Sequence, residues 1–186
     1  LHGYGADMRD LAPLAQELET KRPISWFFPD GHETLDWGGK AWFPIDAAAF
    51  EDAEPDGMAE SRRLLQGMLA ELAVPWDKLV LMGFSQGSMM AVDLALRAPK
   101  SPAGVVILSG ASVDGKTFAS LAPKRKGLRF FQSHGCVDSI LGFSGGLALE
   151  KGLQEAGWDG SLHRFEGGHG VPPEVVDGLG AWLKAL

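Results

Sequence analysis

Hydrophobic runs with few polar interruptions alternate along this chain with segments in which hydrophobic residues recur every three or four positions. The runs consist mainly of Val, Ile, Leu, Met and Phe, and they cover residues 24–28, 78–84, 103–108 and 128–133, with a shorter one at 161–165. Solid runs of this kind predict strands of a parallel sheet that is covered on both faces. Their alternation with amphipathic segments predicts an α/β fold.

The amphipathic segments predict the helices between those strands. We expect helices over 8–21, 57–73, about 140–156 and 173–186, and another that follows residues 85–87 and reaches 97, where Pro99 stops it. Asp7 is expected to cap the first helix. Residues 31–55 show little periodicity, and so long an irregular stretch predicts a segment that serves a site. No repeat, low-complexity tract or linker divides the 186 residues, which therefore predict one domain.

Composition and charge narrow the classes of function. The formal net charge is -7 and the pI is about 5.2, and no basic stripe interleaved with aromatic residues is present, so the charge argues against nucleic acid as a partner. No hydrophobic run is long enough to span a bilayer, which argues against stable membrane insertion. The single cysteine, Cys136, excludes an intrachain disulfide framework and is interpreted as a small packing residue.

These features predict a globular protein of a reducing compartment, most simply the cytoplasm. The chain starts at Leu1 without an initiator methionine, and residues 1–5 read like a strand end running into a loop. Native N-terminal sequence is therefore expected to be missing, which leaves export open.

A nucleophile motif stands between the strand at 78–84 and the following helix. Gly83-Phe84-Ser85-Gln86-Gly87 matches G-x-S-x-G, in which the glycines permit a turn too tight for a β-carbon. An isolated match is also compatible with a plain glycine–serine turn. The strand–turn–helix context favours Ser85 as a nucleophile, with the Gln86 amide at the helix N-terminus directed at a developing oxyanion.

A serine nucleophile needs a base and an orienting carboxylate, in the order serine, acid, histidine along this kind of chain. His169 lies in a glycine-rich loop after the last strand and is the predicted base, with a solvated loop histidine as the alternative. Asp138 follows the penultimate strand and is the predicted acid. Asp114 and Asp159 are better explained as turn or cap residues. His134 is expected to brace the acid loop by hydrogen bonding.

A second oxyanion donor and a pocket can be suggested from the same reasoning. Residues 1–7 match an H-G-x-G segment, and the backbone amide of Tyr4 is the predicted partner of the Gln86 amide, although a glycine turn would explain this segment alone. Residues that could line a substrate pocket are Tyr4, Trp42, Phe43, Met89 and Leu141. Core packing is the alternative for all of them.

Four ordered blocks resemble the phospholipase/carboxylesterase family of α/β-hydrolases, which includes acyl-protein thioesterases and small bacterial carboxylesterases. They are Leu-His-Gly-Tyr-Gly at residue 1, Gly-Phe-Ser-Gln-Gly-Ser-Met-Met-Ala around Ser85, His-Gly-Cys-Val-Asp ending at Asp138, and Gly-Gly-His ending at His169. The resemblance spans essentially the whole chain. Ala-Trp-Phe-Pro-Ile at 41–45 also resembles the aromatic loop of that family.

The resemblance implies one catalytic domain over 1–186 with the α/β-hydrolase fold, a mostly parallel central sheet with helices on both faces, lacking the N-terminal strands in the given chain. It implies a Ser85–His169–Asp138 triad, oxyanion amides at Tyr4 and Gln86, short to medium acyl esters as substrates, no cofactor, no metal, and a possible homodimer. Residues 139–142 differ from the Val-Val-Pro that usually follows the acid. Substrate preference is therefore not transferred.

The sequence predicts a serine carboxylesterase that acts on a small-molecule ester through an acyl-enzyme. Two alternatives stay open. The same triad could prefer thioesters or lysophospholipids. Alternatively, the chain could be an inactive hydrolase-fold binding protein.

Overall fold

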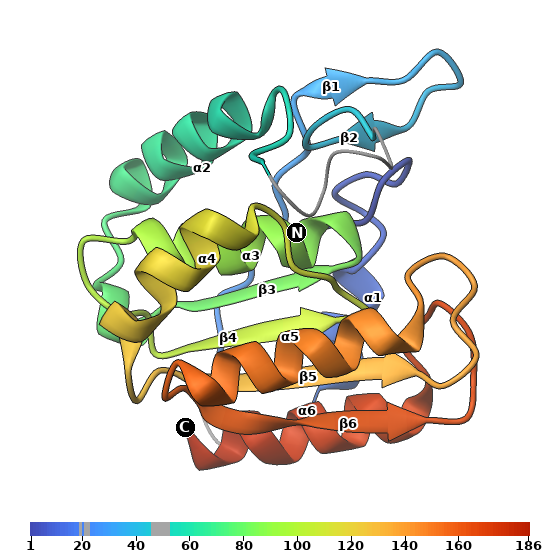
Figure 1. Ribbon diagram of the computed structural model, residues 1–186. Coiled ribbons are helices and arrows are strands. Elements are labelled where there is room, and N and C mark those ends of the chain that lie inside the picture. Colours follow the sequence, from blue (N-terminus) through green and yellow to red (C-terminus); the bar gives the residue numbers. More distant parts are fainter. Residues whose placement is uncertain (19, 21–22, 46–52) are drawn as a thin grey trace.

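A four-stranded parallel sheet forms the centre of the molecule. The computed structural model describes residues 1–18, 20, 23–45 and 53–186. The strands are β3 (Val80–Phe84), β4 (Gly104–Leu108), β5 (Arg129–Gly135) and β6 (Asp159–Phe165), and they are hydrogen-bonded in this order (Figure 1). All three neighbouring pairs are parallel. Their carboxyl ends therefore meet at one edge of the sheet, where the arrowheads point in Figure 1.

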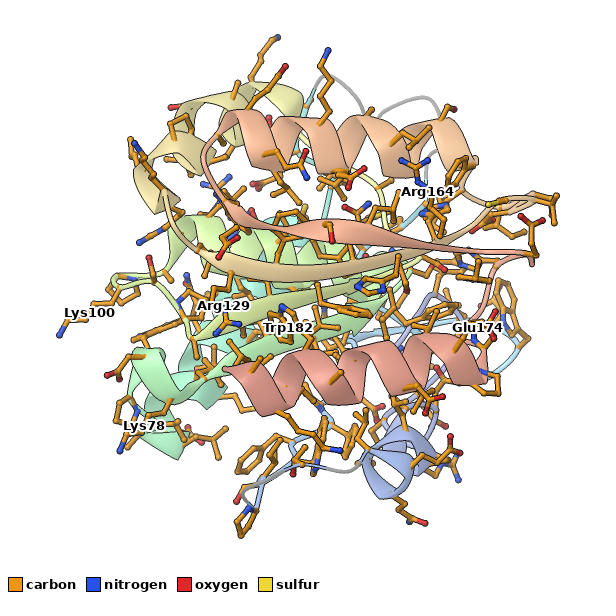
Figure 2. All side chains as sticks on the ribbon, turned by 90° about the horizontal axis from the view of Figure 1, so that it is seen from below. Lys78, Lys100, Arg129, Arg164, Glu174 and Trp182 are labelled. Atoms are coloured by element: carbon orange, nitrogen blue, oxygen red, sulfur yellow. The ribbon has the colours of Figure 1, made fainter. Side chains whose placement is uncertain are left out.

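Helices cover both faces of this sheet. One face carries α3 (Gln86–Arg97), α4 (Gly115–Leu121) and α5 (Phe143–Glu155), with α2 (Met58–Leu72) packed on α3. The other carries α1 (Ala12–Glu17) and α6 (Pro173–Ala185). Figure 2 shows α5 and α6 on opposite sides of the sheet. Two short 3₁₀ turns, Trp76–Lys78 and Ala122–Arg125, precede β3 and β5.

Strand β4 shows why a solid hydrophobic run suits this position. Successive side chains of a strand point to opposite faces. Val105 and Ile107 lie in the core beneath α3 and α5, while Val106 and Leu108 lie in the core beneath α6. Every residue of β4 is buried. The predicted burial on both faces is thus confirmed for β4, whereas on the edge strand β6 only Leu162 and Phe165 are buried.

Helix α6 packs closely against the sheet at the amino ends of β4 and β5. Trp182 of α6 lies beside Arg129, whose guanidinium carbon is 6.0 Å from the indole centroid (Figure 2). A β-carbon on Gly104, the first residue of β4, would come within 2.5 Å of the Trp182 ring. The helix can therefore lie flat against β4 because glycine leaves room for the indole.

The first predicted helix is shorter than expected. The α-helix starts at Ala12 and ends at Glu17, and Asp7 does not cap it. The Asp7 carboxylate instead accepts a hydrogen bond from the Arg9 amide and pairs with its guanidinium, in a turn that precedes the helix. Pro13 stands in the first helical turn, where its missing N–H has no cost, so it favours a start at this point. The predicted end at residue 21 lies outside the described residues.

The predicted strand at 24–28 is wrong, because this segment is irregular and enters no sheet. Together with the exposed edge of β3 it borders an apolar groove of about 400 Å³. A strand forms only where a neighbour completes its backbone hydrogen bonds. At the far end of β3 such a neighbour is Leu1, whose N-terminus donates to the Met82 carbonyl and whose carbonyl accepts from the Phe84 amide.

The described part of the irregular stretch at 31–55 contains a small element that the sequence did not predict. Strands β1 (Glu33–Thr34) and β2 (Lys40–Ala41) form an antiparallel hairpin. Two-residue strands are too short to show a periodic pattern. Residues 46–52 of this stretch lie outside the described part of the chain. None of the helices described here combines the length and the apolar character needed to cross a membrane.

Candidate active site

Ser85 occupies a strained turn between β3 and α3. Its backbone angles are φ 52° and ψ -121°, a conformation that residues other than glycine rarely adopt. The Ser85 amide donates to the Leu108 carbonyl of β4. Such strain persists only where the surroundings enforce it, and it is common at functional sites. The turn therefore has the backbone expected of a nucleophile elbow.

The two glycines of the elbow are required by contact rather than by their φ angles. A β-carbon on Gly83 would lie 2.1 Å from the Gly87 carbonyl group, so the strand end and the helix start touch backbone to backbone. A β-carbon on Gly87 would lie 2.2 Å from the Leu1 carbonyl oxygen. The elbow and the first residues of the chain are thus packed together without side chains between them.

Asp138 and His169 form a hydrogen-bonded pair at the carboxyl ends of β5 and β6. The Nδ1 atom of His169 lies 2.7 Å from Oδ2 of Asp138. The Asp138 side chain is fully buried, whereas that of His169 is 15% exposed. Since the carboxylate accepts, Nδ1 carries the proton and Nε2 is left free to accept one. This is the tautomer that a general base needs.

The charge of Asp138 is stabilised by several donors. Its other oxygen accepts hydrogen bonds from the amides of Ile140 at 2.8 Å and Leu141 at 2.9 Å. Burial raises the pKa of Asp138, but the hydrogen bonds from His169, Leu141 and Ile140 together outweigh burial and lower the pKa below its ordinary value of 3.8. The carboxylate is therefore ionised at neutral pH.

The acid loop, which follows β5 and holds Asp138, is joined by backbone hydrogen bonds to the histidine loop, which follows β6 and holds His169. The Cys136 amide donates to the Phe165 carbonyl, and the Val137 amide donates to the Gly167 carbonyl. A β-carbon on Gly135 would lie 2.2 Å from the Gly168 carbonyl oxygen. Cys136, interpreted from the sequence as a packing residue, is half-buried and contributes its backbone to this junction.

Ser85 and His169 are brought to the same edge of the sheet without a direct hydrogen bond between them. The His169 ring lies 4.9 Å from the ring of Phe84, the residue before the nucleophile. Within the described residues, the Ser85 hydroxyl has no hydrogen-bond partner. Catalytic hydrogen bonds of this type are often long before substrate binds.

Two backbone amides beside Ser85 are available as oxyanion donors. Gln86 is the first residue of α3, where amides have no acceptor within the helix. Neither its amide nor that of Tyr4 donates to another group in the described part of the chain. A β-carbon on Gly3 would lie 3.4 Å from the Ser85 β-carbon, so the residue directly before Tyr4 packs against the nucleophile. The predicted pair of donors therefore lies at the elbow.

His2 supports this segment, a role that sequence reasoning missed. Its ring is buried, its Nδ1 donates to the Gly3 carbonyl at 2.8 Å, and its Nε2 accepts from the Gly31 amide at 2.9 Å. The Trp42 indole donates to the His2 carbonyl at 2.8 Å. The one available signal was the position of His2 directly before the glycines of H-G-x-G, but its partners are distant in sequence.

The buried His2 predicts a loss of stability in mild acid. Burial lowers the pKa of His2 below its ordinary value of 6.5, because the charged imidazolium would lose its hydration. A protonated Nε2 would also have no lone pair to accept from the Gly31 amide. The unfolded chain takes up this proton first, so its stabilising contribution is complete above pH 6.5 and falls as the pH drops toward the lowered pKa. We expect a loss of up to about 1.4 kcal/mol per pH unit in that window.

Denaturant unfolding of the wild type and of His2→Asn between pH 7.5 and 5 measures this contribution. The variant keeps the other four of the five histidines and should show a shallower dependence on pH. Equal slopes for the two proteins would contradict the assignment.

Four of the five predicted pocket residues lie in the hydrophobic core or at its margin. Trp42 and Phe43 are 1% and 0% exposed and belong to the core, where the Gln86 side chain accepts from the Trp42 amide and donates to the Phe43 carbonyl. Met89 is also buried in the core. Leu141 is half-buried at the core's margin. The prediction that these residues contact substrate gains no support from their positions.

Tyr4 has a different neighbour, which the sequence did not single out. Its ring lies 6.3 Å from that of Trp37 in the β1–β2 hairpin, and Trp37 is 70% exposed. The exposed aromatic surface next to the elbow therefore comes from Trp37.

The two rival carboxylates lie away from His169, and for Asp114 the interpreted cap role is confirmed. Asp114 caps α4, its side chain accepting from the Thr117 amide. Asp159 is the first residue of β6, at the opposite end of the strand from His169. Neither can orient the histidine, so Asp138 alone of the three carboxylates meets it.

One family model and several known proteins are similar to this chain over most or all of its length. The phospholipase/carboxylesterase family model matches residues 1–186. Acyl-protein thioesterase 1 of Eremothecium gossypii is 26% identical over 152 residues, which cover 78% of this chain and 65% of that protein. A probable carboxylesterase of Oryza sativa subsp. japonica is 26% identical over 199 residues, 99% of this chain and 75% of the rice protein. The crystal structure of esterase PE8 matches with a TM-score of 0.85 at 28% identity, and the matched region covers 99% of this chain and 89% of the PE8 chain.

Proposed function

This chain belongs to the phospholipase/carboxylesterase family, and we propose that it hydrolyses carboxylic esters with Ser85 as nucleophile, His169 as base and Asp138 as acid. Its α/β-hydrolase fold, predicted from the sequence, is confirmed by the parallel sheet with helices on both faces and by the match to esterase PE8. Members of this family include enzymes named carboxylesterase and acyl-protein thioesterase. The chain is accordingly a hydrolase that acts on esters.

One observation carries the assignment of the catalytic residues. The 2.7 Å hydrogen bond between His169 Nδ1 and the buried Asp138 carboxylate joins two loops that follow different strands. Both loops lie at the edge of the sheet that holds the strained Ser85 turn. A hydrogen-bonded acid and base beside a strained serine is the arrangement that activates a hydroxyl for attack on a carbonyl.

The proposed reaction starts with acylation of the enzyme. His169 Nε2 takes the proton of the Ser85 hydroxyl while the serine oxygen attacks the ester carbonyl carbon. The amides of Tyr4 and Gln86 donate to the carbonyl oxygen as it becomes negatively charged, and the N-terminus of α3 adds favourable potential. The bond to the alkoxy group then breaks, and His169 protonates the departing alcohol. Ser85 is left as an acyl ester.

Deacylation repeats these steps with water as the nucleophile. His169 accepts a proton from water, the resulting hydroxide attacks the acyl carbon, and the same two amides hold the second oxyanion. Collapse of this intermediate releases the carboxylic acid and returns the proton from His169 to Ser85. Asp138 remains ionised throughout and keeps Nδ1 of His169 protonated and in place.

The substrates that we propose are esters of short to medium acyl chains. A second function is favoured by sequence similarity to acyl-protein thioesterase 1 of Eremothecium gossypii, in which the same machinery would cleave an acyl thioester. A thiolate is a better leaving group than an alkoxide and depends less on protonation by His169. Oxygen esters and thioesters of one acyl group therefore differ in the acylation step and share the deacylation step.

Labelling with a fluorophosphonate tests the proposal. We expect covalent modification of the wild type at Ser85, located by mass spectrometry, and competition by p-nitrophenyl butyrate. Hydrolysis of p-nitrophenyl acetate and butyrate, compared with the corresponding acyl thiols, then ranks ester against thioester. Modification of a different serine, or an unmodified protein that also hydrolyses nothing, would refute the assignment and favour an inactive binding protein.

A further inference from the structure

A second histidine contacts the acid of the triad. His134 is the penultimate residue of β5, and its side chain is completely buried. Its Nε2 lies 2.6 Å from the Leu141 carbonyl oxygen and 3.3 Å from Oδ2 of Asp138. Both of these neighbours can only accept, so Nε2 must carry the proton. His134 therefore donates toward the same carboxylate oxygen that receives the hydrogen bond from His169.

Both oxygens of the Asp138 carboxylate therefore face hydrogen-bond donors. Oδ2 lies between the imidazoles of His169, at 2.7 Å, and His134, at 3.3 Å. Oδ1 accepts from the amides of Ile140 and Leu141. Rotation of the carboxylate about its Cβ–Cγ bond would break contacts at both oxygens. The lone pair directed at His169 is consequently fixed in orientation.

The packing around His134 shows that its ring cannot move away. Helix α5 crosses directly over it, since a β-carbon on Gly146 would lie 2.7 Å from Nδ1. The Phe143 ring is 6.1 Å away, centroid to centroid. Nδ1 itself has no hydrogen-bond partner among the described residues. An unpaired buried polar atom costs about 1–3 kcal/mol, so the contacts made by Nε2 must offset that cost.

We propose that His134 is a positioning residue of the triad: it fixes Oδ2 of Asp138 and the Leu141 carbonyl so that the carboxylate faces His169. This role rests on the proposed function. It goes beyond bracing of the loop, because the donor acts on the reacting chain of hydrogen bonds. His134 itself transfers no proton to substrate, since Asp138 separates it from His169.

Substitution of His134 by each of the two amide residues tests the Nε2–H donor independently of the rest of the imidazole. Glutamine can place its amide nitrogen near the position of Nε2, whereas the shorter asparagine places its nitrogen near Nδ1, on the side away from Asp138. We expect His134→Asn to lower kcat by about 10–100-fold with KM changed less than about threefold, as a small misplacement of a catalytic group would. His134→Gln should recover kcat to within about threefold of the wild type.

The pH profile provides a readout that a merely structural role would not move. The titratable groups that face His134 are Asp138 and, beyond it, His169, while Phe143 and Gly146 of α5 add no charge. On β6 the register partner of His134 is Arg164, whose guanidinium lies over the Phe143 ring and 3.9 Å from Glu150. This pair is unchanged in both variants. Without the donor, more of the Asp138 charge acts on the protonated imidazole of His169. The acidic limb of the kcat/KM profile should therefore move to higher pH in His134→Asn and stay in place in His134→Gln.

The experiment measures kcat per active site, with sites counted by fluorophosphonate titration so that unfolded protein does not contribute. A lower kcat and a displaced acidic limb in His134→Asn, with both restored in His134→Gln, would support the proposal. Equal rates and equal profiles for the two variants would overturn it. Failure of the proposed function would look different, because the wild type itself would then neither react with the probe nor turn over ester.

Discussion

Replacing Ser85 with alanine is expected to lower kcat for p-nitrophenyl butyrate by about a millionfold, the size of effect known for removal of a serine nucleophile. The substitution removes only the hydroxyl oxygen. Alanine can occupy the same strained turn, because the neighbouring Gly83 and Gly87 and the hydrogen bond from residue 85 to Leu108 do not depend on the side chain. The unfolding midpoint should therefore remain close to that of the wild type.

The matched control for this change is Ser120→Ala, an exposed serine of α4. Steady-state kinetics of both variants measure the effect on kcat, and thermal unfolding measures the effect on stability. Wild-type turnover by Ser85→Ala would remove the nucleophile assignment. The same loss in Ser120→Ala would point to a general effect of handling rather than of chemistry.

Replacing Asp138 with asparagine is expected to lower kcat by about 10⁴-fold, because it inverts one hydrogen bond. An amide nitrogen at the place of Oδ2 would donate to His169 Nδ1, so the proton would move to Nε2. That nitrogen could then no longer accept the Ser85 proton. The rate should recover partly at high pH, where hydroxide replaces the general base, and kcat against pH from 6 to 10 measures it.

Asp114→Asn is the matched control, since it makes the same chemical change at the cap of α4. Asparagine caps a helix about as well as aspartate, so both activity and stability should be retained. Asp138→Asn should also weaken the dependence of stability on acid. The lowered pKa of Asp138 means that its contribution is complete above its ordinary pKa of 3.8 and is lost as the pH falls below it. A variant with near wild-type kcat would exclude Asp138 as the acid.

Sequence reasoning succeeds where one local segment contains all the information. The elbow at Ser85 is recognisable because a solid strand, a G-x-S-x-G turn and a helix follow each other directly. Burial of β4 on both faces follows from its composition alone. The loops of Asp138 and His169 are placed by the rule that parallel strands present their carboxyl ends at one edge.

It fails where the outcome depends on a partner that is distant in the chain. Residues 24–28 have the composition of a strand, but strand formation needs a hydrogen-bonded neighbour, and that neighbour is not encoded within the segment. Trp42 lies in an aperiodic stretch like a binding residue, yet its indole and amide are used by His2 and Gln86. By contrast, His134 lies only four residues before Asp138, and the expectation that it braces this loop by hydrogen bonding is confirmed by its contact with the Leu141 carbonyl.

The backbone junction between the acid and histidine loops has a mechanical consequence. Because the amides of Cys136 and Val137 bind carbonyls of the neighbouring loop, Asp138 and His169 should shift as one piece whenever this edge of the sheet breathes. Their mutual contact would survive such motion. Such motion would change the distance from the His169 imidazole to the Ser85 hydroxyl. Binding of an acyl group would then need to shorten that distance for the proton transfer.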